Sequence, residues 1–564
     1  MKKQSFLKGS AILVGMVIVT KALGLAYKVP LANILGGTGM GWFMTAFSLF
    51  TPVFALSVSG IPSAMARLAA ENAALGRYAN LRRQKHTAFL VYSLMGLAAC
   101  GAVVGLATLS DSLPLGNTGV RYSLYCLAPS VLFCAVMNVE RGYCEGMGNM
   151  LPTALSEIAE TVFKLGLGLG LALYVRQKAA AGFAADGMVF GTYCADAHAA
   201  EKAALPYIAA AAVLGSTLAS GLACMLLLIG CKLRGDGITS SMLKSDPVKD
   251  SVRRHTSSLL RLSGAISMAA VVTTLTGMID MLTVSPCIRA AMERVPQRFE
   301  KFSDIPPEQL PTFLYGSYEG LAVMIYGLVP TLTAMLGKSA LPPLAEHWTK
   351  GDTCAFRLDL QRLLMLASSA AMPAGLGICA LSGELLRFLF AGRETEIAAA
   401  LHPLEILGVS VIFFGIALPC FTVLQTVGKP SRVTFIMLMS GMVKLALNLL
   451  LIPFLGMEGA ALSELVSCIF VLAAALHSVL KLSGGIRAVP IFVKPFYAGM
   501  MCAVSAKLCS GFLNKAFSAY PHRFLTVIAV IFGGIMYFIS MYLLCEMPKN
   551  ALNYVFLKKS EKST

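Results

Sequence analysis

The segment ILVGMVIVTKALGLAYKVP (residues 12–30) has the apolar composition of a membrane-spanning helix, yet it contains two lysines, Lys21 and Lys28. An ionised side chain at the centre of a bilayer costs about 2.5 to 3.5 kcal/mol on insertion scales. Their spacing is nearly two helical turns, so both ammonium groups project from one helix face, about 10 Å apart. Such groups could bind an anion within the membrane. Snorkelling to the membrane surface is the alternative, and it suits Lys28 better than Lys21.

A polar stripe follows one face of a predicted helix at 151–174. Thr153, Glu157, Glu160 and Lys164 stand at i, i+4, i+7 and i+11, which puts them on one side of the helix. Glu160 and Lys164 are one turn apart in the favourable order, so we predict an ion pair within the helix. A purely structural pair is the alternative, because pairing lets two charges be buried without any function.

Similar polar residues recur in the second half of the chain. Ser440, Lys444 and Asn448 form a stripe at i, i+4 and i+8, and Asp280 lies deep in another apolar segment. Arg67 stands at the predicted cytoplasmic end of the second helix, where a topology signal explains it almost as well. We predict that the stripes line one wet, predominantly positive cavity. The candidate substrate-binding residues are Lys21, Lys28, Arg67, Glu157, Glu160, Lys164, Asp280 and Lys444.

The elements that must position these residues are membrane helices. Of the 564 residues, 57% are apolar and only 13% are charged, whereas about a quarter are charged in soluble domains. A span needs about 20 mostly apolar residues, and we predict an all-α polytopic membrane protein with about fourteen of them. The predicted spans are 9–28, 42–66, 88–109, 121–139, 151–174, 204–230, 258–284, 318–337, 361–382, 402–424, 433–453, 458–480, 491–512 and 524–545.

The distribution of Lys and Arg predicts that both termini are cytoplasmic, because basic loops stay on that side. A cleaved signal peptide within residues 2–26 is the alternative, which Lys21 and the second span directly downstream argue against. The net charge of +17 comes largely from the predicted inner loops, where it fits anionic lipid head groups. The predicted spans leave no stretch long enough for a nucleic-acid-binding domain.

An internal repeat predicts two halves. Gly148 and Lys164 have counterparts in Gly428 and Lys444 at one constant offset, and the same offset maps SGIP onto SALP. Both halves would begin in the cytoplasm, so the repeats would be parallel and would enclose a central cavity. The predicted division is a six-helix lobe at 1–231, a basic linker at 232–256, a second six-helix lobe at 257–480, and two extra helices with a basic tail at 481–564.

Signatures of catalysis and metal binding are missing from the sequence pattern. The fifteen cysteines form no CxxC pair and no metal-ligand spacing, so we interpret them as packing residues, with no metal and no cofactor. His477, within a span, is expected to be a core residue. GKS at 337–339 lacks the upstream glycine of a phosphate-binding loop, because position 332 is leucine. We predict a transporter rather than an enzyme, driven by an ion gradient, the membrane potential or the substrate's own gradient.

Four stretches resemble the MATE-like flippase superfamily, in the polysaccharide-biosynthesis branch of stage V sporulation protein B and the lipid II flippase MurJ. They are TKALGLAYKVPLANILGGTGMG (20–41), SGIPSAMARLAAENAALGRYANLRR (59–83), RGYCEGMGNMLPTALSEIAE (141–160) and LQTVGKPSRV (424–433). The resemblance implies two six-helix lobes plus two further helices. It also implies alternating-access transport of lipid II or a related undecaprenyl-pyrophosphate-linked saccharide to the outer leaflet.

By position, Lys21 matches the basic residue that this family keeps in its first helix, and Glu160 with Lys164 matches an acidic and basic pair in the fifth. The lipid II flippases have arginines six apart in the first helix, whereas this chain has lysines seven apart, which leaves the glycan open. The implied partners are a polyprenyl-pyrophosphate-linked saccharide and membrane lipids, with envelope-synthesis enzymes as a further hypothesis.

Three other classes of function remain open. A drug or cation exporter of the same fold would favour a carboxylate in the first helix and usually has twelve helices. A membrane glycosyltransferase or ligase would need acidic residues on a long outer loop, and a scaffold without transport would tolerate exchange of the buried charges. The coupling ion, the oligomeric state and a role in growth or sporulation are also left open by the sequence.

Overall fold

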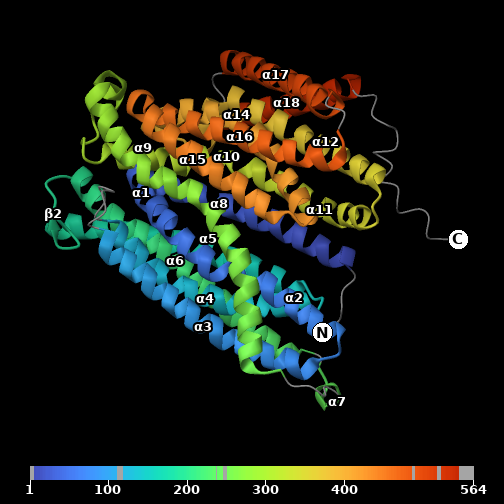
Figure 1. Cartoon of the computed structure of the whole chain (residues 1–564). Helices are drawn as coiled ribbons and strands as arrows, with labels where there is room; N and C mark the ends of the chain where they lie inside the picture. The colour runs from blue at the N-terminus through green and yellow to red at the C-terminus, as the bar shows by residue number, and fades with distance from the viewer. Residues whose placement is uncertain are drawn as a thin grey trace. The chain divides into compact units, whose positions relative to one another are not determined.

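The computed structural model describes residues 6–110, 119–236, 238–244, 250–485, 489–517 and 522–544. The described chain is almost entirely helical, as Figure 1 shows, apart from one two-stranded antiparallel hairpin of β1 (Met188–Val189) and β2 (Thr192–Tyr193). Among the described residues, twelve helices are long and apolar enough to cross a membrane, or thirteen if one bent pair counts as a single span. The predicted all-α, multi-pass membrane architecture is therefore confirmed.

The first helix, α1 (Phe6–Val58), explains why the predicted number of spans is higher. Gly36 breaks it with φ 62° and ψ −174°, a left-handed conformation that glycine adopts without steric cost. The candidate span Gly15–Ala74 covers most of this helix together with the next one, and its 60 residues are about three times the length that one crossing needs. Two of the fourteen predicted spans, 9–28 and 42–66, lie on either side of Gly36, so fourteen remains an approximate number.

The described chain forms two compact units. The first unit comprises residues up to Leu321 together with Leu445–Met457, and the second comprises Ala322–Lys444 and the residues from Glu458 onward. This division by packing differs from the predicted division by repeat, because the helix after the linker, α8, packs with the first unit. The two lobes of the repeat stay a prediction.

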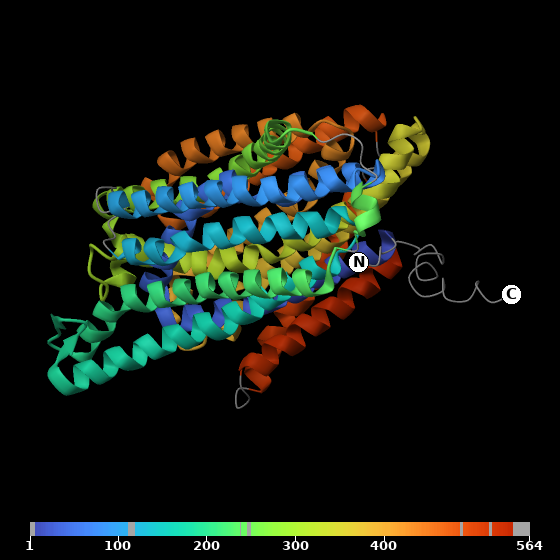
Figure 2. The ribbon, with the colours of Figure 1, turned by 90° about the horizontal axis from the view of Figure 1, so that it is seen from below.

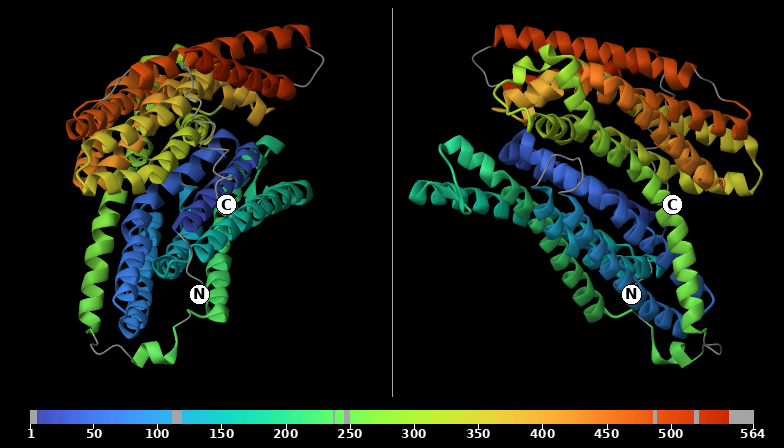
Figure 3. Two further views of the ribbon diagram at one scale, coloured as in Figure 1. Left: turned by 90° about the vertical axis from the view of Figure 1, so that its right-hand side faces the viewer. Right: turned by 60° about the vertical axis from the view of Figure 1, so that its left-hand side comes forward.

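Besides α1, the first unit contains eight further helices. They are α2 (Ile61–Ala74), α3 (Tyr78–Leu109), α4 (Val120–Gly146), α5 (Leu151–Asp186), α6 (Ala197–Arg234), α7 (Ser240–Lys244), α8 (Val252–Arg294) and α9 (Leu310–Ser317). The short helices η2 (Pro296–Phe302) and η3 (Tyr318–Ala322), the β1–β2 hairpin and the end of α15 also belong to this unit, η3 up to Leu321. Helix α5 packs along α6, α4 packs against α3 and α6, and α1 packs along α4 and α5. The hairpin lies where the chain passes from the end of α5 to the start of α6 (Figure 3).

A glycine on α6, Gly215, allows α6 to pack closely on α5 at Gly168. A Cβ atom on Gly215 of α6 would lie 2.5 Å from both the backbone nitrogen and the Cα atom of Gly168 on α5. Real side chains do not approach backbone atoms that closely, so only glycine fits at Gly215. Small residues at such crossings are typical of helix packing in membranes, where van der Waals contact replaces the hydrophobic effect.

The second unit contains the remaining helices. They are α10 (Val323–Tyr326), α11 (Leu328–Thr349), α12 (Thr353–Ala380), α13 (Ser382–Leu389), α14 (Glu394–Thr426), the part of α15 (Pro430–Leu455) up to Lys444, α16 (Met457–Ser483), η4 (Val489–Val493), α17 (Lys494–Ala516) and α18 (His522–Leu544). Helices α17 and α18 pack together, and α17 packs against α12 (Figure 2). Side chains such as Leu508 (70% exposed) and Phe538 (66% exposed) leave this pair with apolar faces suited to lipid.

Candidate functional site

A buried arginine organises the polar stripe of α5. Arg141, near the end of α4 and 7% exposed, places one guanidinium nitrogen 3.0 Å from Glu160 Oε2 and the other 3.8 Å from Glu157 Oε1. Its Nε donates a hydrogen bond to Ser156 Oγ at 2.8 Å, and Ser220 of α6 donates to Glu160 Oε1 at 2.7 Å. Arg141 therefore compensates both carboxylates of the stripe, with help from neutral donors.

This arrangement corrects the predicted pair of Glu160 with Lys164. Among the described residues these two form no ion pair, since Glu160 is bound by Arg141 and Ser220. The ammonium group of Lys164 lies 5.3 Å from the ring centroids of both Tyr27 and Phe47 on α1. Ring faces attract a cation but do not neutralise its charge. Lys164 therefore remains a source of positive charge between α5 and α1.

Two of the lysines of the predicted site, Lys21 and Lys164, lie within electrostatic range of the third, Lys28, in the first unit. The Lys28 ammonium interacts with those of Lys21 and Lys164, which repel it, and with the Glu319 carboxylate on η3, which attracts it. Lys21 is exposed and Lys28 is half-buried. We call Lys21, Lys28 and Lys164 the lysine cluster.

Asp280 of α8 is 3% exposed and belongs to a different polar contact of the first unit. Asn448 of α15 donates one hydrogen bond to Asp280 Oδ1 and one to Thr283 Oγ1, both at 2.9 Å. Asn448 is a member of the predicted stripe 440–448, so the stripe helps to satisfy a buried carboxylate.

Lys444 belongs to the second unit, where its ammonium group forms an ion pair with Glu464 of α16. Glu464 also accepts a hydrogen bond from the Tyr326 hydroxyl at 3.0 Å. Lys444 is 3% exposed, so its charge is buried together with a compensating carboxylate. Arg67 is exposed on α2 and has no ion-pair partner in the described part of the chain. This position fits a topology signal as well as it fits a substrate-binding role.

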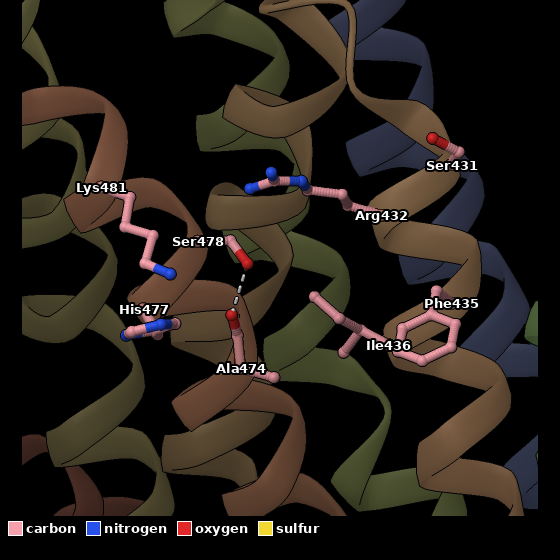
Figure 4. Close-up of a pocket in the computed structure, with 8 residues that line it drawn as sticks. All are labelled: Ser431, Arg432, Phe435, Ile436, Ala474, His477, Ser478 and Lys481. Atoms are coloured by element: carbon pink, nitrogen blue, oxygen red, sulfur yellow. Dashed lines mark hydrogen bonds between the residues drawn. The ribbon is translucent and has the colours of Figure 1, made fainter.

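A further cationic pocket, of about 520 Å³, lies between the start of α15 and the end of α16. Figure 4 shows Arg432 extending from α15 towards α16, which carries His477 and Lys481. None of these three side chains has an ion-pair partner in the described ranges, and Phe435 and Ile436 add an apolar wall. His477 is exposed in this pocket, so its expected place in the core is wrong.

Sequence reasoning missed Arg141, Ser220 and Glu319. Arg141 opens the motif that leads into the α5 stripe, but its position near a helix end suggested nothing beyond a topology signal. Ser220 and Glu319 come from distant segments, and only the packing of α6 and η3 brings them near the charged residues.

Comparison with known proteins gives the same picture as the motifs. The family of polysaccharide biosynthesis proteins matches residues 6–190. Stage V sporulation protein B of Bacillus subtilis is 24% identical over 92% of this chain and 90% of its own, and the lipid II flippase MurJ of the same organism is 22% identical over 81% and 79%.

Solved structures with the same fold include a lipid II flippase MurJ in an inward closed conformation. Its TM-score is 0.62 at 14% identity, over 94% of this chain and 98% of the other. An inward-facing multidrug resistance transporter of the MATE family gives a TM-score of 0.61 at 12% identity, over 84% and 98%. The predicted resemblance to the MATE-like superfamily and to its polysaccharide branch is thus confirmed, and the multi-pass fold is one that these solved structures share.

Proposed function

We propose that the protein flips a polyprenyl-pyrophosphate-linked saccharide, lipid II or a related glycan, from the inner to the outer leaflet by alternating access. The lysine cluster is the observation that carries this proposal. In the first unit it places the Lys28 ammonium within electrostatic range of those of both Lys21 and Lys164, whereas Arg141 is already engaged with carboxylates. The name of one relative, a lipid II flippase, supports the same class of substrate.

The lysine cluster suits a pyrophosphate for electrostatic reasons. Like charges that repel one another are stabilised by an anion placed among them, and the gain is large where water is scarce. Lysine acts as a compact point charge rather than a bidentate fork, so it can attract a phosphate without fixing its orientation. Such contacts hold the head group loosely enough for it to be released on the other side of the membrane. The lipid tail of the substrate stays in the bilayer.

A drug or cation exporter is the competing function, since MATE transporters share the fold. Its cargo would have to approach Lys21 and Lys28, which repel cations. Of the carboxylates in the predicted site, Glu160 is paired with Arg141, and Asp280 accepts a hydrogen bond from the neutral amide of Asn448. The charge arrangement therefore favours an anionic cargo. The coupling ion and a partnership with envelope-synthesis enzymes stay predictions.

Complementation tests the proposal. A strain depleted of its essential lipid II flippase would receive wild-type protein, Lys21→Ala or Lys515→Ala, at matched membrane levels. Lys515 is an exposed lysine near the end of α17, outside the lysine cluster, so its variant is the control. We expect growth with wild type and Lys515→Ala and at least a tenfold loss of viable cells with Lys21→Ala.

Each result has a definite meaning. Rescue by both lysine variants would place the anion elsewhere and contradict the role of the lysine cluster. Failure of well-expressed wild type would exclude lipid II in that host. Flipping of other polyprenyl-pyrophosphate saccharides in vesicles that contain purified protein would then decide between another glycan and no flipping at all.

A further inference from the structure

A second polar cluster lies in the first unit and is independent of the lysine cluster. The thiols of Cys144, near the end of α4, and Cys231, near the end of α6, lie 3.7 Å apart, Sγ to Sγ. Glu140 is one helical turn before Cys144, and a ligand atom from each of the three residues lies within 4.8 Å of the other two. Cys144 and Glu140 are buried, and Cys231 is half-buried.

The distance between the two thiols fits a tetrahedral metal. Zn²⁺ binds cysteine sulfur at about 2.3 Å, and two such bonds at the tetrahedral angle hold the sulfur atoms about 3.8 Å apart. A disulfide would require about 2.05 Å instead. The observed 3.7 Å separation therefore matches two ligands of one ion without any movement of α4 or α6.

The charges around the cluster also fit a divalent ion. Zn²⁺ with two thiolates and one carboxylate has a net charge of −1, since +2 − 2 − 1 = −1. Lys85 of α3 compensates that charge, because its ammonium lies 2.7 Å from Glu140 Oε1 and 4.2 Å from the Tyr143 ring centroid. Glu140 has a second oxygen for the metal, so Lys85 can keep its contact. Without metal, Lys85 and Glu140 form an ion pair that is neutral overall.

We propose that Glu140, Cys144 and Cys231 bind Zn²⁺, with a water molecule as the fourth ligand and Lys85 as the charge-balancing neighbour. Thiolate ligands select thiophilic ions such as Zn²⁺ over Mg²⁺ or Ca²⁺. Under the predicted topology the ends of α4 and α6 face the reducing cytoplasm, where thiols persist. Binding releases the two thiol protons to water and forms two zinc–sulfur bonds, with no oxidant or reductant. The ion would join the ends of α4 and α6.

The test uses full-length protein purified in detergent with reductant, treated with chelator and then titrated with Zn²⁺. We expect one tight equivalent of Zn²⁺ per chain and a higher thermal unfolding temperature, because a ligand that binds only the folded state stabilises it. Co²⁺ in place of Zn²⁺ should give the visible absorption of a tetrahedral ion and near-ultraviolet thiolate-to-metal bands. Cys126→Ser on α4 is the matched control and should behave like wild type.

Substitutions of the three proposed ligands test which residues bind the ion. Cys144→Ser and Cys231→Ser should each weaken Zn²⁺ binding by at least tenfold and remove part of the thiolate band, and Glu140→Gln should weaken binding while keeping that band. If a serine variant does not fold, mass spectrometry of wild type gives the answer instead, because Zn²⁺ should protect the half-buried Cys231 from maleimide but leave the exposed Cys354 reactive. Unchanged Zn²⁺ binding in the double serine variant, no thiolate band in wild type, or no protection would overturn the proposal.

Discussion

At the scale of single residues, the stability of the charged site depends on Arg141. One buried guanidinium contacts two carboxylates that stand one turn apart on α5, and it reaches them across the α4–α5 packing. A buried cation and carboxylate are costly to separate, because removal of one partner leaves the other uncompensated in a medium of low polarity. Arg141 is therefore a structural support of the site rather than a contact for the substrate.

Replacement of Arg141 by methionine should lower the free energy of unfolding by about 2 to 4 kcal/mol, because Glu157 and Glu160 are only partly exposed and lose their cation. Adding Glu160→Gln to that variant should restore part of the loss, since one uncompensated charge disappears. Thermal unfolding in detergent measures both effects. Arg176→Gln breaks the exposed pair with Glu201 and should cost about 1 kcal/mol or less. Equal losses for Arg141 and Arg176 would contradict this view.

At the scale of elements, the approach of α5 to α6 holds the polar stripe in place. Gly168 and Gly215 let the backbones touch, which keeps Ser220 of α6 within hydrogen-bonding reach of Glu160 on α5. Helix pairs in membranes are stabilised by such close contact rather than by exclusion of water. A side chain at this crossing would therefore disturb the site as well as the packing.

Gly215→Ala should destabilise the protein by about 1 to 3 kcal/mol, because the new methyl group would overlap backbone atoms of Gly168. Gly230→Ala, on the same helix, is the control, since a Cβ there meets nothing within 4 Å. Alanine favours a helix over glycine by up to about 1 kcal/mol, so the control should be neutral or slightly stabilising. Comparison of unfolding temperatures checks this, and two unchanged values would refute the close approach.

The cationic pocket between the start of α15 and the end of α16 is a second feature that two neighbouring helices form. Two charges near a membrane surface are together worth about 2 kcal/mol towards an anionic head group. Arg432→Gln combined with Lys481→Gln should therefore weaken binding of phosphatidylglycerol to the purified protein more than tenfold, as measured by native mass spectrometry. Arg234→Gln, an exposed arginine at the end of α6, should have little effect. Unchanged lipid binding in the double variant would exclude the pocket as an anion site.

At the scale of the whole molecule, the described chain is a multi-pass membrane protein of the MATE and MurJ fold that packs as two units. The helix after the linker and the end of α15 pack with the first unit, so the compact units cut across the predicted repeat. The membrane orientation belongs to this scale, because every proposed site depends on it. The lysine cluster, the cationic pocket and the proposed zinc site all assume cytoplasmic termini.

Reporter fusions should confirm that orientation. A C-terminal green fluorescent protein should fluoresce, and alkaline phosphatase at the same position should be inactive, because basic loops keep the terminus in the cytoplasm. Alkaline phosphatase fused after Gly191, in the turn of the β1–β2 hairpin, should be active, since that turn falls in a predicted outer loop. Active phosphatase at the C-terminus would reverse the orientation.

The sequence by itself determined the membrane class, the approximate number of spans and the family resemblance, because apolar runs and ordered motifs are local properties of the chain. It also singled out Lys21, Lys28 and Lys164 as charges that an apolar segment would not normally contain. Only the tertiary structure decided which charges are compensated. Glu160 pairs with Arg141 rather than with Lys164, and Cys144 meets Cys231, because contacts between helices depend on packing that spacing along one helix does not specify.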